Sequence, residues 1–263
     1  YKRFGLGDRD AGEEDDPVWE LRRSVLGGPQ VQPLKRVDVE GVAGAFLVPE
    51  LLSKEECASI VSLGEELGFT AGGDVVDVPT EIRSNDVCVF VAPAALSAEL
   101  SARLAPLVPE SGAKGMGRCK PDFVNARFRL YRYAYCLPQC RGAGGELEAS
   151  QRFRPHYDGT QSPGAAAEGR LVDDTGGGAC RSQLSLLLYL NDGHAGGETV
   201  FYPGGDPEDA AAAVRVSPRT GTALCFWHGE HPLSPLHEGA ALAAVGAPKY
   251  VIRTDLLFYK EAA

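Results

Sequence analysis

The sequence predicts a mainly β protein with flanking helices (α+β), whose core is a double-stranded β-helix, or jelly roll, of about eight strands. Short apolar runs separated by Gly- and Pro-containing turns recur over residues 127–259. Two segments with helical spacing precede them, within residues 53–107. With 263 residues, 44% of them hydrophobic, the chain can bury one large core. We therefore expect an arm over residues 1–40 and a single domain over residues 41–263.

The N-terminal residues 1–40 are charged and punctuated by Pro and Gly, with an acidic run at residues 13–16 after Gly12. Few apolar positions recur there, so we expect an arm that is ordered only where Trp19, Leu21 and Val25 can dock.

Two helices are predicted ahead of the β core, after a short apolar strand over residues 42–48. Ser53 has the character of an N-cap and is followed by an acidic first turn, and apolar residues continue at helical spacing as far as Gly68. Leucines at helical spacing over residues 94–107 indicate the second helix. Both are expected to support the core by packing.

The strands are predicted from apolar runs and from alternation of apolar and polar residues. In chain order they are 87–91, 127–135, 183–190, 198–202, 214–216, 223–227 and a last apolar strand that begins near residue 249. Two Gly-rich stretches, 136–150 and 161–180, interrupt this series. Long irregular segments in a compact domain are either functional or disordered, and we favour a lid over a substrate.

The segment Pro155-His156-Tyr157-Asp158 places an imidazole and a carboxylate two residues apart. In a β-strand, His156 and Asp158 would share a face. A second imidazole could come from His237, in Leu236-His237-Glu238-Gly239. Two histidines and one carboxylate form the facial triad that holds iron(II) and leaves coordination positions open.

Segments around and after this motif carry a family resemblance: Gly196-Gly197-Glu198-Thr199, residues 221–228, His237-Glu238-Gly239 and residues 246–255. In this order they resemble the catalytic domain of the prolyl 4-hydroxylase-like branch of the iron(II)- and 2-oxoglutarate-dependent dioxygenases, over about residues 45–260. The resemblance implies hydroxylation of a substrate C–H bond by O2, with release of succinate and CO2 and with ascorbate as reductant. A prolyl residue in a peptide or protein is the implied substrate.

The resemblance also implies roles for individual residues. Lys249 would grip the far carboxylate of 2-oxoglutarate, and the Tyr133 hydroxyl would bond to the same co-substrate. Ser185 matches a small hydroxyl position facing that pocket. Arg253 shares a strand face with Lys249, roughly 13 Å beyond it, and is the reserve anchor. Tyr133 also belongs to an alternating tyrosine stripe, which more commonly marks a half-buried sheet surface.

Other histidines compete with His237 as the distal ligand, because His228 and His231 precede it closely. The family signature favours His237. Trp227 is expected to line a substrate groove, where aromatic rings are common.

The segment that contains Arg83, Asn85 and Asp86 resembles a motif that some members of the branch carry on the substrate side of the site. The alternative, a polar turn leading into the strand 87–91, stays open.

Two other functions remain compatible with these residues. One is the same chemistry on another amino-acid side chain or on a small metabolite. The other is a catalytically silent jelly-roll module that binds peptides. The presence of all of His156, Asp158, His237 and Lys249 counts against the silent module.

The composition of the chain limits the kinds of binding partner that we expect. The net charge of −10 and the pI near 5.0 argue against a nucleic-acid partner. No run of eighteen apolar residues predicts a membrane span. The chain begins at Tyr1 rather than Met, so we expect either a trimmed chain or a mature fragment, and a removed targeting segment stays open.

Cysteine usage bears on the compartment. Seven thinly spread cysteines favour reduced thiols, and hence the cytoplasm over the endoplasmic reticulum lumen. Cys136, Cys140 and Cys180 could form a zinc clip or a loop disulfide, or remain simple thiols.

Overall fold

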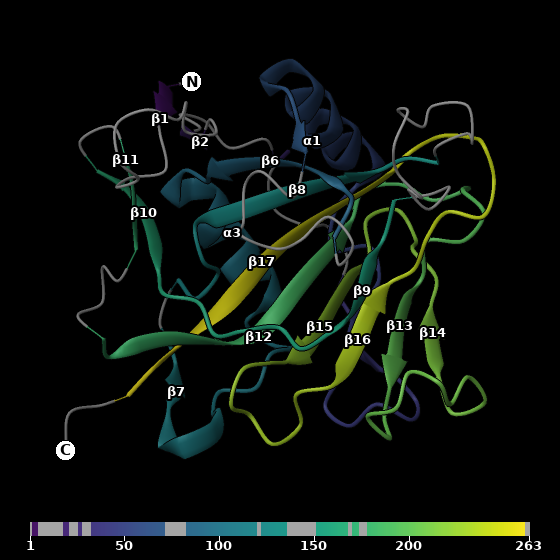
Figure 1. Cartoon of the computed structure of the whole chain (residues 1–263). Helices are drawn as coiled ribbons and strands as arrows, with labels where there is room; N and C mark the ends of the chain where they lie inside the picture. The colour runs from purple at the N-terminus through teal and green to yellow at the C-terminus, as the bar shows by residue number, and fades with distance from the viewer. Residues whose placement is uncertain are drawn as a thin grey trace, which may run out of the picture.

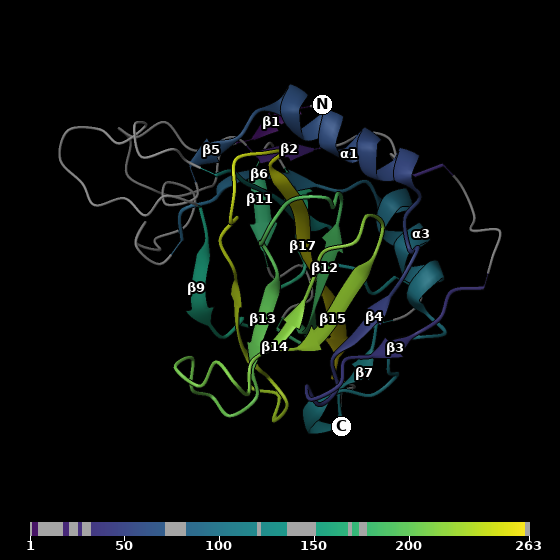
Figure 2. The ribbon, with the colours of Figure 1, turned by 90° about the vertical axis from the view of Figure 1, so that its right-hand side faces the viewer.

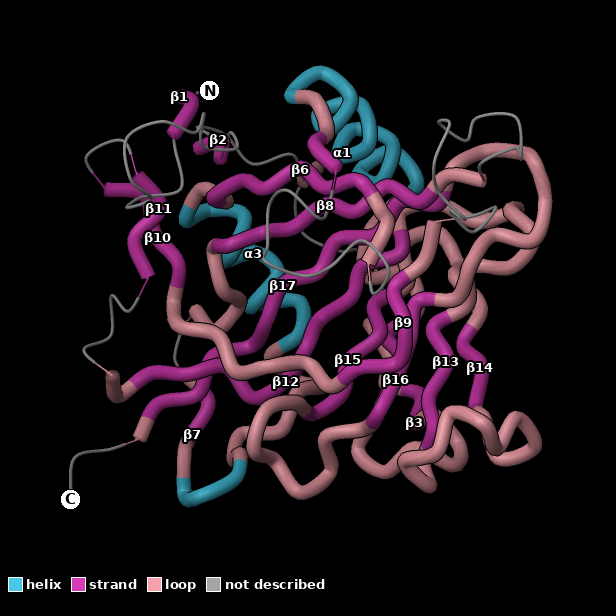
Figure 3. The backbone as a smooth tube through the Cα atoms, viewed as in Figure 1, coloured by secondary structure: helices cyan, strands magenta, loops and turns pink. Residues whose placement is uncertain are grey.

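The computed structural model describes residues 2–4, 18–20, 26–27, 33–71, 83–119, 122–135, 151–167, 170–173 and 178–260. These residues form a mainly β structure with two α-helices, α1 (Lys54–Leu67) and α3 (Ala94–Leu104), and a 3-10 turn, η1 (Ala113–Gly115). Figure 3 shows how few helical segments accompany the strands. The predicted fold class is confirmed.

The larger sheet has the order β1-β2-β6-β8-β17-β12-β15-β4-β3, with β5 added beside β6 and β7 beside β17. All its described pairs are antiparallel except β2 with β6. Its strands are β1 (Lys2–Phe4), β2 (Val18–Glu20), β3 (Val37–Asp38), β4 (Phe46–Val48), β5 (Thr70–Ala71), β6 (Asp86–Val91), β7 (Gly117–Arg118), β8 (Arg127–Tyr133), β12 (Cys180–Tyr189), β15 (Ala223–Trp227) and β17 (Lys249–Tyr259).

The smaller sheet has the order β14-β13-β16-β9. Its strands are β9 (Phe153–His156), β13 (Thr199–Tyr202), β14 (Val214–Val216) and β16 (Leu236–Gly239). They lie side by side at the right of Figure 1, next to β17, β12 and β15. Four strands of the larger sheet, β8-β17-β12-β15, and these four make the eight strands of a jelly roll.

Successive side chains along a strand point to opposite faces of the larger sheet, and each face packs into its own hydrophobic core. Leu224 and Phe226 of β15 face the inside of the roll, while Ala223, Cys225 and Trp227 pack on its helical side. Helices α1 and α3 cover that outer side (Figure 2), with Ile60 and Leu100 in the same cluster as Trp227. A capping box between Ser53 and Glu56 begins α1, as predicted.

Several bounds differ from the sequence expectation. The strand expected over 42–48 is reduced to β4, because residues 39–45 form hydrogen-bonded turns. The stretch 161–180 contains a hairpin of β10 (Gly164–Ala167) and β11 (Arg170–Asp173), so it is not wholly irregular. The other candidate lid, 136–150, lies outside the described residues. Among the described helices, none is long and apolar enough to cross a bilayer.

Two other expectations fall partly outside the described residues. Trp19 lies in β2, which pairs with β6, whereas Leu21 and Val25 are not described. Of the three cysteines considered for pairing, Cys136 and Cys140 are not described. The Cys180 sulfur lies 3.3 Å from that of Cys119, a neighbour that sequence spacing did not suggest.

Candidate metal centre

The two histidines of the predicted triad meet across the smaller sheet. His156 ends β9 and His237 lies in β16, and the two residues are direct partners in the antiparallel pairing. Asp158 lies two residues past the end of β9, in a loop rather than in the strand that the sequence suggested. Ligand atoms of all three residues lie within 4.8 Å of one another. The structure thus brings the predicted ligands together.

Hydrogen bonds from Nδ1 leave Nε2 of each imidazole as the nitrogen available to a metal. His156 Nδ1 lies 2.7 Å from the Arg154 carbonyl oxygen, and His237 Nδ1 lies 3.2 Å from that of Pro235. A carbonyl only accepts, so Nδ1 carries the proton and Nε2 keeps its lone pair. The two Nε2 atoms lie 3.5 and 3.6 Å from the oxygens of Asp158.

The charge states also suit a divalent metal. Burial lowers the pKa of His237 to about 4, so this imidazole is neutral at physiological pH. Burial opposes ionisation of Asp158, but Arg253, His237 and His156 hold its pKa well below the usual value. Two imidazoles with Nε2 atoms turned inward and one carboxylate fit iron(II).

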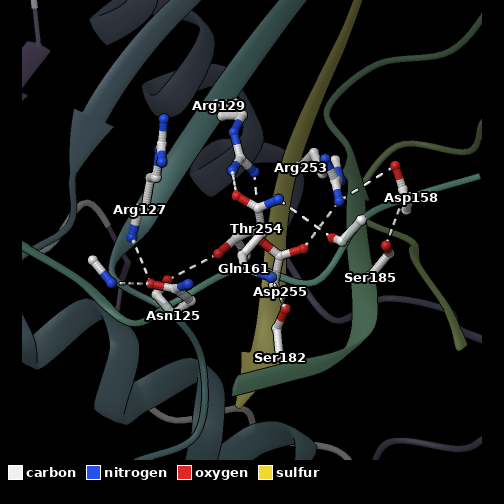
Figure 4. A network of polar contacts seen from close by, with 12 residues as sticks. Asn125, Arg127, Arg129, Asp158, Gln161, Ser182, Ser185, Arg253, Thr254 and Asp255 are labelled. Carbon is white, nitrogen blue, oxygen red and sulfur yellow. Dashed lines mark hydrogen bonds and ion pairs between the residues drawn. The ribbon is translucent and has the colours of Figure 1, made fainter. Parts of the chain in front are cut away.

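A chain of buried charges continues from Asp158 into the larger sheet (Figure 4). Arg253 Nη2 lies 3.3 Å from Asp158 Oδ1 and 3.2 Å from Asp255 Oδ1. Arg129 Nη1 lies 3.4 Å from the other oxygen of Asp255. Two guanidinium groups therefore balance two carboxylates. Arg253 lies on the strand face expected for it. Its guanidinium group, however, forms ion pairs with Asp158 and Asp255 rather than standing free to bind the co-substrate.

Lys249 begins β17 and is only 2% exposed. Its Nζ donates to the Gly197 carbonyl at 2.7 Å and lies 4.9 Å from the centroid of the Tyr133 ring. No ion pair to a described carboxylate satisfies this ammonium group, and burial lowers its pKa to about 8 against the opposing charge of Glu198. A buried cation without a counterion is ready to receive an anion.

One pocket contains both the triad and this cation. Its lining includes His156, Asp158 and His237 together with Lys249, Tyr133 and Arg253. Because β17 alternates, Lys249, Val251 and Arg253 share the inward face, as predicted.

Three predicted substrate-side residues divide between two faces. The Arg83 guanidinium lies 4.3 Å from the Tyr131 ring centroid, and that ring lines the pocket. Asn85 accepts a hydrogen bond from Arg83 Nε at 2.9 Å. Asp86, by contrast, pairs with Arg132 at 3.0 Å, on the opposite strand face. The prediction for Asp86 is wrong, because its register in β6 directs it toward the helices.

Two further expectations require correction. Trp227 does not line the pocket that holds the triad: alternation along β15 turns its ring toward the helices, where it stacks on His231 at 3.8 Å between centroids. Ser185 faces inward, but its hydroxyl donates to Asp158 Oδ2 at 2.6 Å, and Ser185 is absent from the lining of the Lys249 pocket. The neighbouring His228 is buried outside the triad.

Aromatic rings support the ligands in a way that the sequence did not reveal. Phe153 stacks on His156 with ring centroids 3.5 Å apart, and Phe226 contacts His237 at 4.6 Å. Phe226 was placed in a predicted strand, but only the packing of the two sheets against each other brings it to the candidate metal site. Phe153 could have been identified from the sequence only because it lies three residues before His156.

Comparisons with known proteins agree with this site. Residues 143–254 match the family model of the 2OG-Fe(II) oxygenase superfamily, and this segment contains all three ligands and Lys249. No curated protein matches the chain.

Solved structures resemble the chain at low identity. The viral collagen prolyl hydroxylase of Paramecium Bursaria Chlorella virus-1 is 16% identical, with a TM-score of 0.45 over 88% of this chain and 98% of that one. A Pseudomonas putida prolyl-4-hydroxylase is 17% identical, with a TM-score of 0.44 over 83% and 93%. An oxidoreductase of the 2OG-Fe(II) oxygenase family from Burkholderia pseudomallei is 13% identical, with a TM-score of 0.47 over 84% and 88%. The segment of this chain that contains the candidate triad is thus similar to the 2OG-Fe(II) oxygenase superfamily.

Proposed function

We propose that this protein is an iron(II)- and 2-oxoglutarate-dependent hydroxylase that acts on a prolyl residue in a peptide or protein substrate. The observation that carries the oxygenase part is the buried Lys249 ammonium group, which shares a pocket with His156, Asp158 and His237. A dicarboxylate chelating a metal at the triad would place its second carboxylate deeper in this pocket, where a cation is needed.

Each residue has a defined task in this proposal. The Nε2 atoms of His156 and His237 and one oxygen of Asp158 hold the metal. Lys249 binds the far carboxylate of the co-substrate, and Tyr133, whose ring lies beneath the ammonium group, offers its hydroxyl to the same carboxylate. Bound iron(II) supplies the activation of O2 and the oxidative decarboxylation of 2-oxoglutarate to succinate and CO2, with transfer of one oxygen atom to the substrate. Ascorbate is proposed as the reductant that keeps the metal as iron(II).

The peptide part of the proposal rests on a second pocket, of about 390 Å³, beside the ligand segments. Its lining includes Tyr157, which stands between two ligands and is 58% exposed, and Leu236, which precedes the third. Tyr202 and Pro203 extend the same surface. Tyrosine-lined grooves suit extended, proline-containing chains.

A silent binding module is the alternative from a different class. Burying Lys249 without a carboxylate partner among the described residues costs stability, and a module without a co-substrate would gain nothing from that cost. The same chemistry on a small metabolite remains the second candidate, because the pocket beside Tyr157 is open to solvent.

Succinate formation from 2-oxoglutarate by the purified protein, with iron(II) and ascorbate, tests the oxygenase part. We expect turnover in the wild type and none in His156→Ala or His237→Ala. His231→Ala is the matched control, since His231 lies outside the triad. If the wild type neither turns over 2-oxoglutarate nor binds it in calorimetry, the silent module replaces this proposal.

A panel of proline-containing peptides tests the substrate part. We expect mass spectrometry to find the gain of one oxygen atom on a proline. Turnover of 2-oxoglutarate without such a product on any peptide would exclude the prolyl substrate but keep the oxygenase.

A further inference from the structure

A continuous hydrogen-bond chain leads from the metal ligand Asp158 to a buried histidine that does not belong to the triad. The Ser185 hydroxyl contacts Asp158 Oδ2 at 2.6 Å and His228 Nδ1 at 2.8 Å. The other ring nitrogen of His228 lies 2.7 Å from the Ser182 hydroxyl, whose oxygen accepts from the Gln161 backbone N–H at 2.8 Å. Figure 4 shows Ser185 directed at Asp158 from β12.

The positions of the protons along this hydrogen-bond chain follow from which groups can only accept or must donate. An ionised carboxylate only accepts, so Ser185 donates its single proton to Asp158 and must accept from His228 Nδ1–H. In neutral His228, Nε2 is then an acceptor and receives the Ser182 proton. Burial lowers the pKa of His228, which keeps the ring neutral against the opposing charge of Asp255. Each donor thus has one acceptor, and a single arrangement satisfies the whole chain.

The same segment also holds the backbone of Asp158. Gly229, next to His228, donates its N–H to the Asp158 carbonyl at 2.9 Å, and the His228 N–H bonds to the Gln183 carbonyl at 2.9 Å. Asp158 needs such support because it lies past the end of β9, where the pairing that aligns His156 with His237 no longer acts.

We propose that His228 is a positioning residue, which through Ser185 fixes the Asp158 carboxylate in the orientation that binds the metal. The inference rests on the proposed function, since it assumes that the triad holds a divalent metal. This role explains why His228, whose side chain is only 1% exposed, is buried next to the triad although it is not one of the three ligands. Partners that orient a metal ligand typically contribute about 10- to 100-fold to metal affinity.

The test measures Mn(II) affinity of the metal-free protein by calorimetry, without co-substrate. His228→Phe keeps the bulk of the ring but removes both nitrogens, and we expect Mn(II) to bind about 10- to 100-fold more weakly. His228→Asn retains an N–H donor near the Nδ1 position, so it should recover much of the affinity. His231 lies three residues later and takes no part in this hydrogen-bond chain, so His231→Phe should bind Mn(II) with wild-type affinity.

Ser185→Ala provides a second variant if His228→Phe does not fold, because it removes only the hydroxyl that links the two residues. A merely structural role for His228 would lower the melting temperature and leave Mn(II) affinity unchanged. Wild-type affinity in both His228→Phe and Ser185→Ala would overturn the inference and leave the proposed function standing. A wild-type protein that binds no Mn(II) would overturn both.

Discussion

The carboxylate of Asp158 and the guanidinium of Arg253 form an ion pair inside the protein, with Oδ1 and Nη2 3.3 Å apart. The side chains are 4% and 12% exposed, so water screens this pair little. Arg253 also contacts Asp255, which has no exposed surface. A candidate metal ligand is therefore part of the charge balance of the core, so we expect metal binding and folding stability to be coupled.

Replacing Arg253 with Gln should destabilise the protein, because the buried Asp158 would lose its guanidinium partner and Asp255 would keep only Arg129. Breaking a buried ion pair in this way costs about 3–5 kcal/mol. Urea unfolding of the metal-free protein measures this loss. Arg215→Gln, at an exposed position of β14, should change the free energy of unfolding by about 0.5 kcal/mol or less.

Added Mn(II) should raise the melting temperature of Arg253→Gln more than that of the wild type, since the metal ion restores positive charge beside Asp158. An equal rise in both proteins would contradict the charge balance described above.

Removing the Lys249 ammonium group should weaken co-substrate binding without changing metal binding. Lys249→Met should weaken 2-oxoglutarate binding by roughly 10- to 100-fold, the usual contribution of a charged hydrogen bond. Mn(II) affinity should stay as in the wild type, because Lys249 is not a ligand. Calorimetry with each ligand in turn makes the comparison, and a parallel loss of both affinities would count against the assigned role.

The affinity for 2-oxoglutarate should depend on pH through the same residue. Burial holds the pKa of Lys249 near 8, so the cation that receives a carboxylate is present below that pH. Above pH 8 the free protein loses this proton, and binding the anion requires its return. The dissociation constant should therefore rise by about tenfold per pH unit above 8. A constant value from pH 7 to 9.5 would show that another group binds the carboxylate.

A buried ion pair between Glu56 and Arg103 should matter for stability but not for the site. Arg103 Nη2 lies 2.8 Å from Glu56 Oε1, and Glu56 also completes the capping box of α1. Glu56→Gln should cost about 3 kcal/mol in urea unfolding. Mn(II) affinity at the triad should not change, since α1 covers the outer face of the sheet. A change in that affinity would reveal coupling across the sheet.

Much of the fold could be predicted because apolar alternation and turns are local properties of the chain. That Lys249 and Arg253 share a strand face followed from a period of two alone, and the structure agrees. The predictions for Asp86, made from the resemblance, and for Trp227, made from the frequency of aromatic rings in grooves, failed because neither argument says which face of a strand points inward. Register against neighbouring strands decides that.

The sequence by itself predicted the fold class, the three candidate ligands and the presence of a cation on the last strand, because each is carried by residue type and spacing. Only the tertiary structure decided the partners of those residues. Arg253 with Asp158, and His228 with Ser185, are separated by 95 and 43 positions, and they meet through the pairing of distant strands. Such contacts depend on which buried polar groups must satisfy one another once the chain has folded, and no local pattern records that.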